Sequence, residues 1–157
     1  MRPARAAVPP GPGGPLPMQD RVRDIMETQL VTISATDRLS TVEDIMTLGH
    51  VRHMPVVQGG RLVGVVSERD LLRASLSVFS EHRDAERRAF LHVVELERVM
   101  STPPIVVEPD ATIEEAALIM AEKKIGCLPV VEGEVLVGMI TETDILGWVA
   151  GVDPEGS

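Results

Sequence analysis

The chain has 157 residues, 44% of them hydrophobic and 25% charged, which is ordinary for a globular protein and predicts one compact domain. Its formal charge of −9 argues against binding to a long nucleic acid, which requires a sustained basic surface. The single cysteine, Cys127, excludes an internal disulfide bond and favours a cytoplasmic location, and no hydrophobic run approaches the roughly 18 residues that span a bilayer.

The first seventeen residues, MRPARAAVPPGPGGPLP, contain six prolines and three glycines. This composition cannot bury enough hydrophobic surface to offset the entropy lost on ordering, so it predicts a disordered tail over residues 1–17. The segment also lacks the hydrophobic stretch of a signal peptide.

The rest of the chain contains a repeat. Residues 26–72 align with residues 100–146 without a gap at a spacing of 74, and fourteen of the 47 aligned pairs are identical. Average composition would give roughly three, so the match indicates an internal duplication. We predict a first repeat over residues 18–80, a helical linker over 81–95, a second repeat over 96–150 and a flexible C-terminus over 151–157.

Each repeat begins with a short β-branched run, Leu30–Ile33 or Ile105–Val107, which predicts a strand. A helix follows. Next come two hydrophobic runs around a glycine-bearing loop, which predict a β-hairpin. The runs are MPVV and LVGVV in the first repeat, and LPVV and LVGMI in the second. The hairpin leads into a second helix. A unit of about 50 residues buries too little surface to be stable alone. We therefore expect an α+β fold in which two β-α-β-β-α repeats pack sheet to sheet with pseudo-twofold symmetry.

The first helix of each repeat shows the spacing of a buried helical face. In the second repeat the hydrophobic positions are Ile113, Ala116, Ala117 and Met120. Thr112 begins a predicted capping box there, whereas Asp37 or Ser40 is the expected cap in the first repeat. Gly49 and Gly126 are expected to break the helical pattern near the ends of the two helices.

Between the repeats, residues 73–98 are rich in Glu, Arg, Ala and Leu, which favours helix. The sequence allows a break near Ser80–Asp84. We expect an extension of the first repeat's last helix, followed by a helical linker.

Three segments recur in both repeats: VRDIM with LERVM, MPVV with LPVV, and LVGVVSERDLL with LVGMITETDIL. Together they resemble the CBS domain, named after cystathionine β-synthase, in its tandem form, the Bateman module. The resemblance covers about residues 22–148. It implies the two-repeat fold described above, pairing into homodimers, and two clefts that bind adenosine-containing ligands.

Ser67 with Asp70, and Thr141 with Asp144, have two interpretations. A hydroxyl residue followed three places later by an acid is a capping box that begins a helix. The same helix N-terminus offers free N–H groups to an anion, and the aspartate can accept hydrogen bonds from ribose hydroxyls. The preceding glycine permits close backbone approach to a ligand. The two interpretations are compatible, although local sequence alone favours the cap.

The resemblance implies that each cleft draws on both repeats. One cleft would combine Met139, Thr141, Thr143 and Asp144 with Thr28, Leu30, Val31, Arg52 and His53. In that cleft the two apolar residues would line the base, and the arginine and histidine would face phosphate.

The other cleft would combine Val65, Ser67, Arg69 and Asp70 with Thr102, Pro104, Ile105, Gly126 and Cys127. Here Gly126 and Cys127 stand where the first repeat has Arg52 and His53. We therefore predict that the cleft of Asp144 is the stronger phosphate site.

The sequence contains no catalytic constellation, because it has no P-loop, nucleophile elbow or dinucleotide fingerprint. His50 and His53 lack the further ligands that zinc requires. We predict a non-enzymatic regulatory module without a cofactor, which senses an adenine nucleotide or adenosyl compound for a partner protein. The alternative is a ligand-free structural or dimerisation module.

Overall fold

The computed structural model describes residues 20–78 and 84–152, so the predicted tail, the predicted helix break and most of the predicted flexible C-terminus lie outside the described residues. The chain forms two compact units rather than the one domain expected from its length. One unit contains Leu30–Ile105 and is called the first-repeat unit. The other combines residues 20–29 with residues 106–152 and is called the second-repeat unit.

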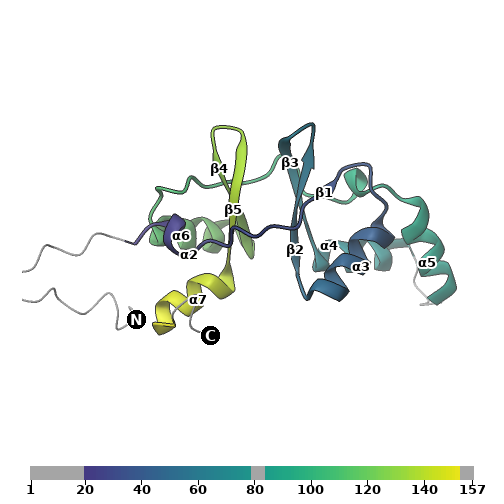
Figure 1. Ribbon diagram of the computed structural model, residues 1–157. Helices are drawn as coiled ribbons and strands as arrows, with labels where there is room; N and C mark the ends of the chain where they lie inside the picture. Colours follow the sequence, from purple (N-terminus) through teal and green to yellow (C-terminus); the bar gives the residue numbers. More distant parts are fainter. Residues whose placement is uncertain (1–19, 79–83, 153–157) are drawn as a thin grey trace, which may run out of the picture. The chain divides into compact units, whose positions relative to one another are not determined.

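The first-repeat unit contains a three-stranded sheet covered by helices (Figure 1). Its elements are β1 (Ile33–Ser34), α3 (Leu39–Gly49), β2 (His53–Gln58), β3 (Arg61–Ser67), α4 (Glu68–Val78), α5 (Asp84–Val93) and the short 3-10 helix η1 (Leu96–Arg98). Strand β1 lies parallel to β2, and β2 and β3 form the predicted antiparallel hairpin.

The second-repeat unit contains the counterparts of α3, β2, β3 and α4 at a spacing of 74 residues, and within the described residues it has no counterpart of α5. Its elements are α2 (Val22–Ile25), α6 (Ile113–Lys123), β4 (Cys127–Glu132), β5 (Val135–Thr141) and α7 (Glu142–Ala150). Strands β4 and β5 form the hairpin, and Val107 pairs in parallel with Val130 where β1 pairs with β2 in the other unit. The predicted mixed α+β fold with two helix-and-strand repeats is confirmed. The packing of sheet against sheet and the repeat boundaries stay predictions.

One local prediction is wrong in detail. The first strand of each repeat is shorter than predicted, since only Ile33–Ser34 forms β1 and only Val107 forms a bridge in the second repeat. The predicted breaks near the helix ends are confirmed, since α3 ends at Gly49 and α6 ends at Lys123, three residues before Gly126. Their C-caps are His50 and Lys124, which adopt the left-handed conformation with φ of 53° and 56°.

The capping prediction is confirmed for the first helix of the second repeat and wrong for that of the first repeat. Thr112 caps α6 with the predicted box: its hydroxyl accepts from the backbone N–H of Glu115 at 3.1 Å. In the first repeat the N-cap is Arg38, which makes no side-chain cap, and not Asp37 or Ser40. Asp37 instead accepts a hydrogen bond from the backbone N–H of Ser34 at 2.8 Å, because its carboxylate closes the turn after β1.

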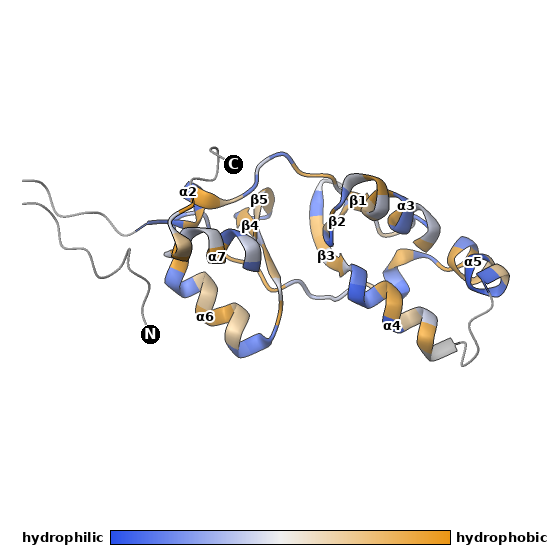
Figure 2. Cartoon of the chain, turned by 90° about the horizontal axis from the view of Figure 1, so that it is seen from below, coloured by the Kyte–Doolittle hydropathy of each residue, from blue (hydrophilic) through white to orange (hydrophobic). Residues whose placement is uncertain are grey.

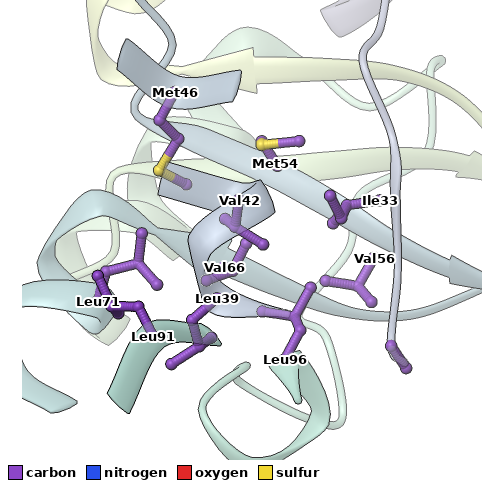
Figure 3. Close-up of a cluster of buried hydrophobic side chains, with 11 residues drawn as sticks. Ile33, Leu39, Val42, Met46, Met54, Val56, Val66, Leu71, Leu91 and Leu96 are labelled. Carbon is purple, nitrogen blue, oxygen red and sulfur yellow. The ribbon is translucent and has the colours of Figure 1, made fainter. Parts of the chain in front are cut away.

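The core of the first-repeat unit lies between the sheet and its helices (Figure 3). It is built almost entirely of aliphatic side chains and methionines, as the scarcity of aromatic residues requires. Leu71 of α4 and Leu91 of α5 both reach this core, so the predicted linker helix is part of the unit. The Arg87 guanidinium on α5 pairs with the Glu43 carboxylate on α3.

The second-repeat unit has its own core around Ile113, Leu128, Ile140 and Trp148. Val22 of α2 is fully buried in it, although it lies more than 80 residues earlier in the sequence than the other members. The backbone N–H of Val22 donates to the carbonyl of Ala111 at 2.9 Å.

The opening segment of each repeat therefore packs in the unit of the other repeat. We define these crossing segments as residues 20–29 and residues 96–105. In the first, Glu27 exchanges two backbone hydrogen bonds with Met139 of β5, at 2.8 and 2.9 Å. In the second, Ser101 exchanges two with Val65 of β3, at 3.1 and 2.8 Å. The two units are thus matched in how each receives its crossing segment.

No helix within residues 20–78 and 84–152 has the length and hydrophobicity to cross a membrane.

Candidate functional site

The second-repeat unit places Thr141 at the end of β5 and at the N-cap of α7. The backbone N–H of Thr141 donates to Asp144 Oδ2 at 2.9 Å, and the backbone N–H of Asp144 donates to Thr141 Oγ1 at 3.3 Å. The Thr141 hydroxyl lies 3.0 Å from Asp144 Oδ2, to which it donates. The predicted capping box is confirmed. We call Thr141, Thr143 and Asp144 the Thr141 corner.

The first-repeat unit has the same arrangement at the end of β3. The backbone N–H of Ser67 donates to Asp70 Oδ2 at 2.8 Å, and the backbone N–H of Asp70 donates to Ser67 Oγ at 3.1 Å. Both side chains are half-buried, and the neighbouring Arg69 is exposed. We call Ser67, Arg69 and Asp70 the Ser67 corner.

Each capping box leaves hydrogen-bonding capacity unused. Within the described part of the chain, the cap bonds go to Oδ2 of Asp70 and Asp144, and Oδ1 of each accepts no hydrogen bond. Because each carboxylate is half-buried at the start of a helix, its Oδ1 is available to a ligand hydroxyl.

The two corners differ in their hydroxyls. Thr141 both accepts and donates within its box, so the exposed Thr143 is the hydroxyl left for a ligand at that corner. Ser67 only accepts in its box, and its hydroxyl hydrogen makes no bond to another described residue. The capping hydroxyl is therefore free to donate to a ligand phosphate at Ser67 but not at Thr141.

The structure also shows what surrounds each corner within its own unit. Arg52 lies beside the Ser67 corner, because its carbonyl accepts from the first N–H of α4, that of Glu68, at 2.8 Å. His53 is the residue opposite Ser67 in the hairpin. The Ser67 corner therefore contains one exposed arginine, Arg69, and adjoins the backbone of a second, Arg52.

At the Thr141 corner the equivalent residues are uncharged. The Gly126 carbonyl accepts from the N–H of Glu142 at 2.9 Å, and Cys127 lies opposite Thr141. The predicted contributions of Leu30, Val31, Arg52 and His53 to this corner join residues of both units and stay predictions.

The crossing segments bring further predicted residues to the corners. In the first-repeat unit Thr102 Oγ1 donates to the Val63 carbonyl at 3.0 Å, two residues before Val65. Pro104 is half-buried and Ile105 is 39% exposed. In the second-repeat unit the exposed Thr28 follows Glu27, the partner of Met139.

The glycine before each corner has a packing role that was not predicted. A Cβ atom at Gly64 would lie 2.8 Å from the Ser101 carbonyl oxygen, and one at Gly138 would lie 3.1 Å from that of Glu27. These glycines therefore admit the crossing segments, and their predicted approach to a ligand stays a prediction. Sequence reasoning missed this packing, because the recurrence of VRDIM and LERVM does not say in which unit each motif packs.

No group of three or more His, Cys, Asp or Glu side chains suited to a metal ion occurs within residues 20–78 and 84–152.

Comparisons with known proteins identify the repeated pattern. The CBS domain family model matches residues 22–77 and 96–151. The CBS domain-containing protein YhcV of Bacillus subtilis is 30% identical over 124 residues, which cover 79% of this chain and 81% of that protein.

Two solved structures show the same fold. The CBS domain of a CBS domain-containing membrane protein from Sphaerobacter thermophilus aligns with a TM-score of 0.68 and 30% identity, over 82% of this chain and 86% of that one. CBSX2, solved in complex with AMP, aligns with a TM-score of 0.70 over 84% of this chain and 97% of that one. Its identity of 24% makes it a likeness of fold alone.

Proposed function

Because the chain belongs to the CBS domain family, we propose that it is a non-enzymatic regulatory module that binds an adenosine-containing ligand, such as AMP, ADP or ATP, and transmits the signal to a partner protein. The observation that carries this proposal is the free Oδ1 of Asp70 and Asp144, each beside a helix N-terminus and a hydroxyl. A ribose offers the hydroxyl donors that such a carboxylate accepts, and the helix N-terminus favours an anionic phosphate. The AMP bound to CBSX2 makes adenine nucleotides the first ligands to test.

We propose that each corner forms one ligand site. The first site comprises Thr28, Leu30, Val31, Arg52, His53, Met139, Thr141, Thr143 and Asp144. The second comprises Val65, Ser67, Arg69, Asp70, Thr102, Pro104 and Ile105. All seven residues of the second site belong to the first-repeat unit, which supports this grouping.

The chain passes between the two units after Gln29 and again after Ile105. Four proposed ligand contacts, Leu30, Val31, Pro104 and Ile105, lie at these passages. A ligand bound there would bias the arrangement of the units, but only by the difference between its affinities for the alternative arrangements. We propose that this bias is the signal read by a partner.

Thermal unfolding of the full chain with AMP, ADP, ATP, S-adenosylmethionine, NAD and cyclic di-AMP tests the proposal. A ligand at 100 times its dissociation constant should stabilise the protein by about 2.7 kcal/mol. Asp144→Asn should lose this stabilisation, because the amide oxygen still accepts the cap hydrogen bonds but an NH2 donor replaces the Oδ1 that would accept from the ribose. Glu115→Gln changes the same chemistry in a capping box outside both corners, and should keep it.

Melting curves that stay flat across this panel would refute ligand binding. A titration in which Asp70→Asn abolishes binding and Asp144→Asn does not would reverse the predicted order of the two sites.

A ligand-free dimerisation module is the second candidate, and the outer face of α4 favours self-association. Arg69, Leu72, Arg73 and Leu76 line a hollow of about 440 Å³ on this face, and Figure 2 shows hydrophobic and hydrophilic residues mixed along the helix. Leu72 is 54% exposed. We propose that this face forms a homodimer contact, because burial of exposed leucines in one row along the helix would stabilise the dimer.

Light scattering at increasing protein concentration tests this contact. The wild type should have the mass of a dimer, and Leu72→Glu should have that of a monomer. Leu118→Glu is the matched control, since Leu118 is similarly exposed on α6 and should not affect the mass. A monomeric wild type would contradict the homodimer.

A further inference from the structure

Met26 and Met100 occupy equivalent positions, 74 residues apart, one in each crossing segment. They differ from the other methionines of the described chain in their exposure. Met46, Met54, Met120 and Met139 are between 0% and 6% exposed. Met26 and Met100 are only partly buried, at the edge of the second-repeat and first-repeat cores respectively. Met26 and Met100 are therefore the more exposed methionines of the described chain.

Both sulfur atoms lie against the backbone of a glycine. A Cβ atom built on Gly64 would be 2.9 Å from Met100 Sδ, and one on Gly138 would be 2.6 Å from Met26 Sδ. Both distances are well inside the normal van der Waals separation, so there is no room for another atom between the sulfur and the glycine. The next residue in each segment makes the paired hydrogen bonds that attach the segment to the unit, Glu27 to Met139 and Ser101 to Val65.

We propose that Met26 and Met100 are oxidation sites at which a peroxide detaches the crossing segments. The thioether sulfur attacks one oxygen of hydrogen peroxide, the O–O bond breaks, and an S–O bond forms. The sulfur loses two electrons and becomes a sulfoxide, and after proton transfer the peroxide leaves as water. The sulfoxide oxygen is polar and bulky, so it favours solvent over the contact with glycine.

Detachment would act on the neighbouring corner through β5 or β3. Met139 lies two residues before Thr141, and Val65 lies two residues before Ser67. Loss of the paired hydrogen bonds would leave the edge of each strand unpaired immediately before its capping box. The inference concerns the attachment of the segments and does not depend on the proposed ligand.

Peptide mass spectrometry after brief treatment of the folded full chain with hydrogen peroxide tests the accessibility. We expect Met26 and Met100 to gain one oxygen roughly ten times faster than the four buried methionines, and all six to react alike in urea. Equal rates for the six in the folded protein would refute the proposal. A Cys127→Ala background removes thiol oxidation from the measurement.

Trp148, the single tryptophan, reports whether the first crossing segment is attached, because its indole contacts Asp20 of that segment. Peroxide should shift its emission and lower the melting temperature, and a methionine sulfoxide reductase should restore both. Met26→Leu should abolish the emission change, whereas Met46→Leu should leave it intact. Oxidation of Met26 without any change in emission or melting would overturn the proposed detachment.

Discussion

The indole Nε1–H of Trp148 donates to Asp20 Oδ2 at 2.6 Å, across a separation of 128 residues in the sequence. This bond fastens the start of the first crossing segment to α7, in the core of the second-repeat unit. Trp148 is 8% exposed, so its N–H requires a partner within the protein.

Replacing Asp20 tests this attachment. Asp20→Ala should lower the free energy of unfolding by about 1 to 2 kcal/mol, because it removes a charged acceptor from a buried N–H. Asp20→Asn retains an acceptor oxygen and should cost less. Urea unfolding followed by Trp148 fluorescence measures both. Equal stability of the Ala variant and the wild type would show that the bond contributes nothing.

Two glycines of the second-repeat unit should respond in opposite ways to alanine. Gly138→Ala should destabilise the protein by roughly 1 to 3 kcal/mol, since its methyl group would collide with Met26 and the Glu27 carbonyl. Gly147→Ala lies inside α7, where the nearest atom to the new methyl is 4.0 Å away in Val152. It should stabilise by about 0.5 to 1 kcal/mol. Thermal unfolding of the two variants compares them directly, and a neutral Gly138→Ala would contradict the close packing of the crossing segment.

The left-handed C-cap of α6 predicts a stabilising substitution. Lys124 has φ of 56°, a conformation that costs a side-chain-bearing residue free energy and that glycine adopts freely. Lys124→Gly should therefore stabilise by up to about 1 kcal/mol. Lys123→Gly, one residue earlier and inside the helix, should destabilise by about the same amount. Chemical denaturation distinguishes the two, and loss of stability in both would refute the assigned cap.

Alanine substitutions of Thr141 and Thr143 distinguish helix capping from ligand binding. Thr141→Ala removes the acceptor for the Asp144 N–H and should cost about 1 kcal/mol of stability even without ligand. Thr143→Ala changes an exposed residue and should leave the unliganded protein as stable as the wild type. If the Thr141 corner binds a nucleotide, Thr143→Ala should weaken binding, which calorimetric titration with AMP would measure. Unchanged affinity in Thr143→Ala would remove that residue from the proposed site.

The sequence by itself determined the repeat and the local structures that depend on neighbours in the chain. The hairpin strands, the Thr112 cap and the boxes at Ser67 and Thr141 follow from side chains that interact within three or four residues or alternate along a strand. The resemblance carried by the repeated motifs gave the family.

Only the tertiary structure decided which repeat each opening segment joins. Val22 and Val99 belong to equivalent motifs, and nothing in their local sequence says that each packs in the unit of the other repeat. The same holds for Gly64 and Gly138, whose small size is explained by a carbonyl from a distant segment. Short-range patterns encode which face of an element is hydrophobic, whereas the choice of partner depends on shape and burial summed over the whole fold.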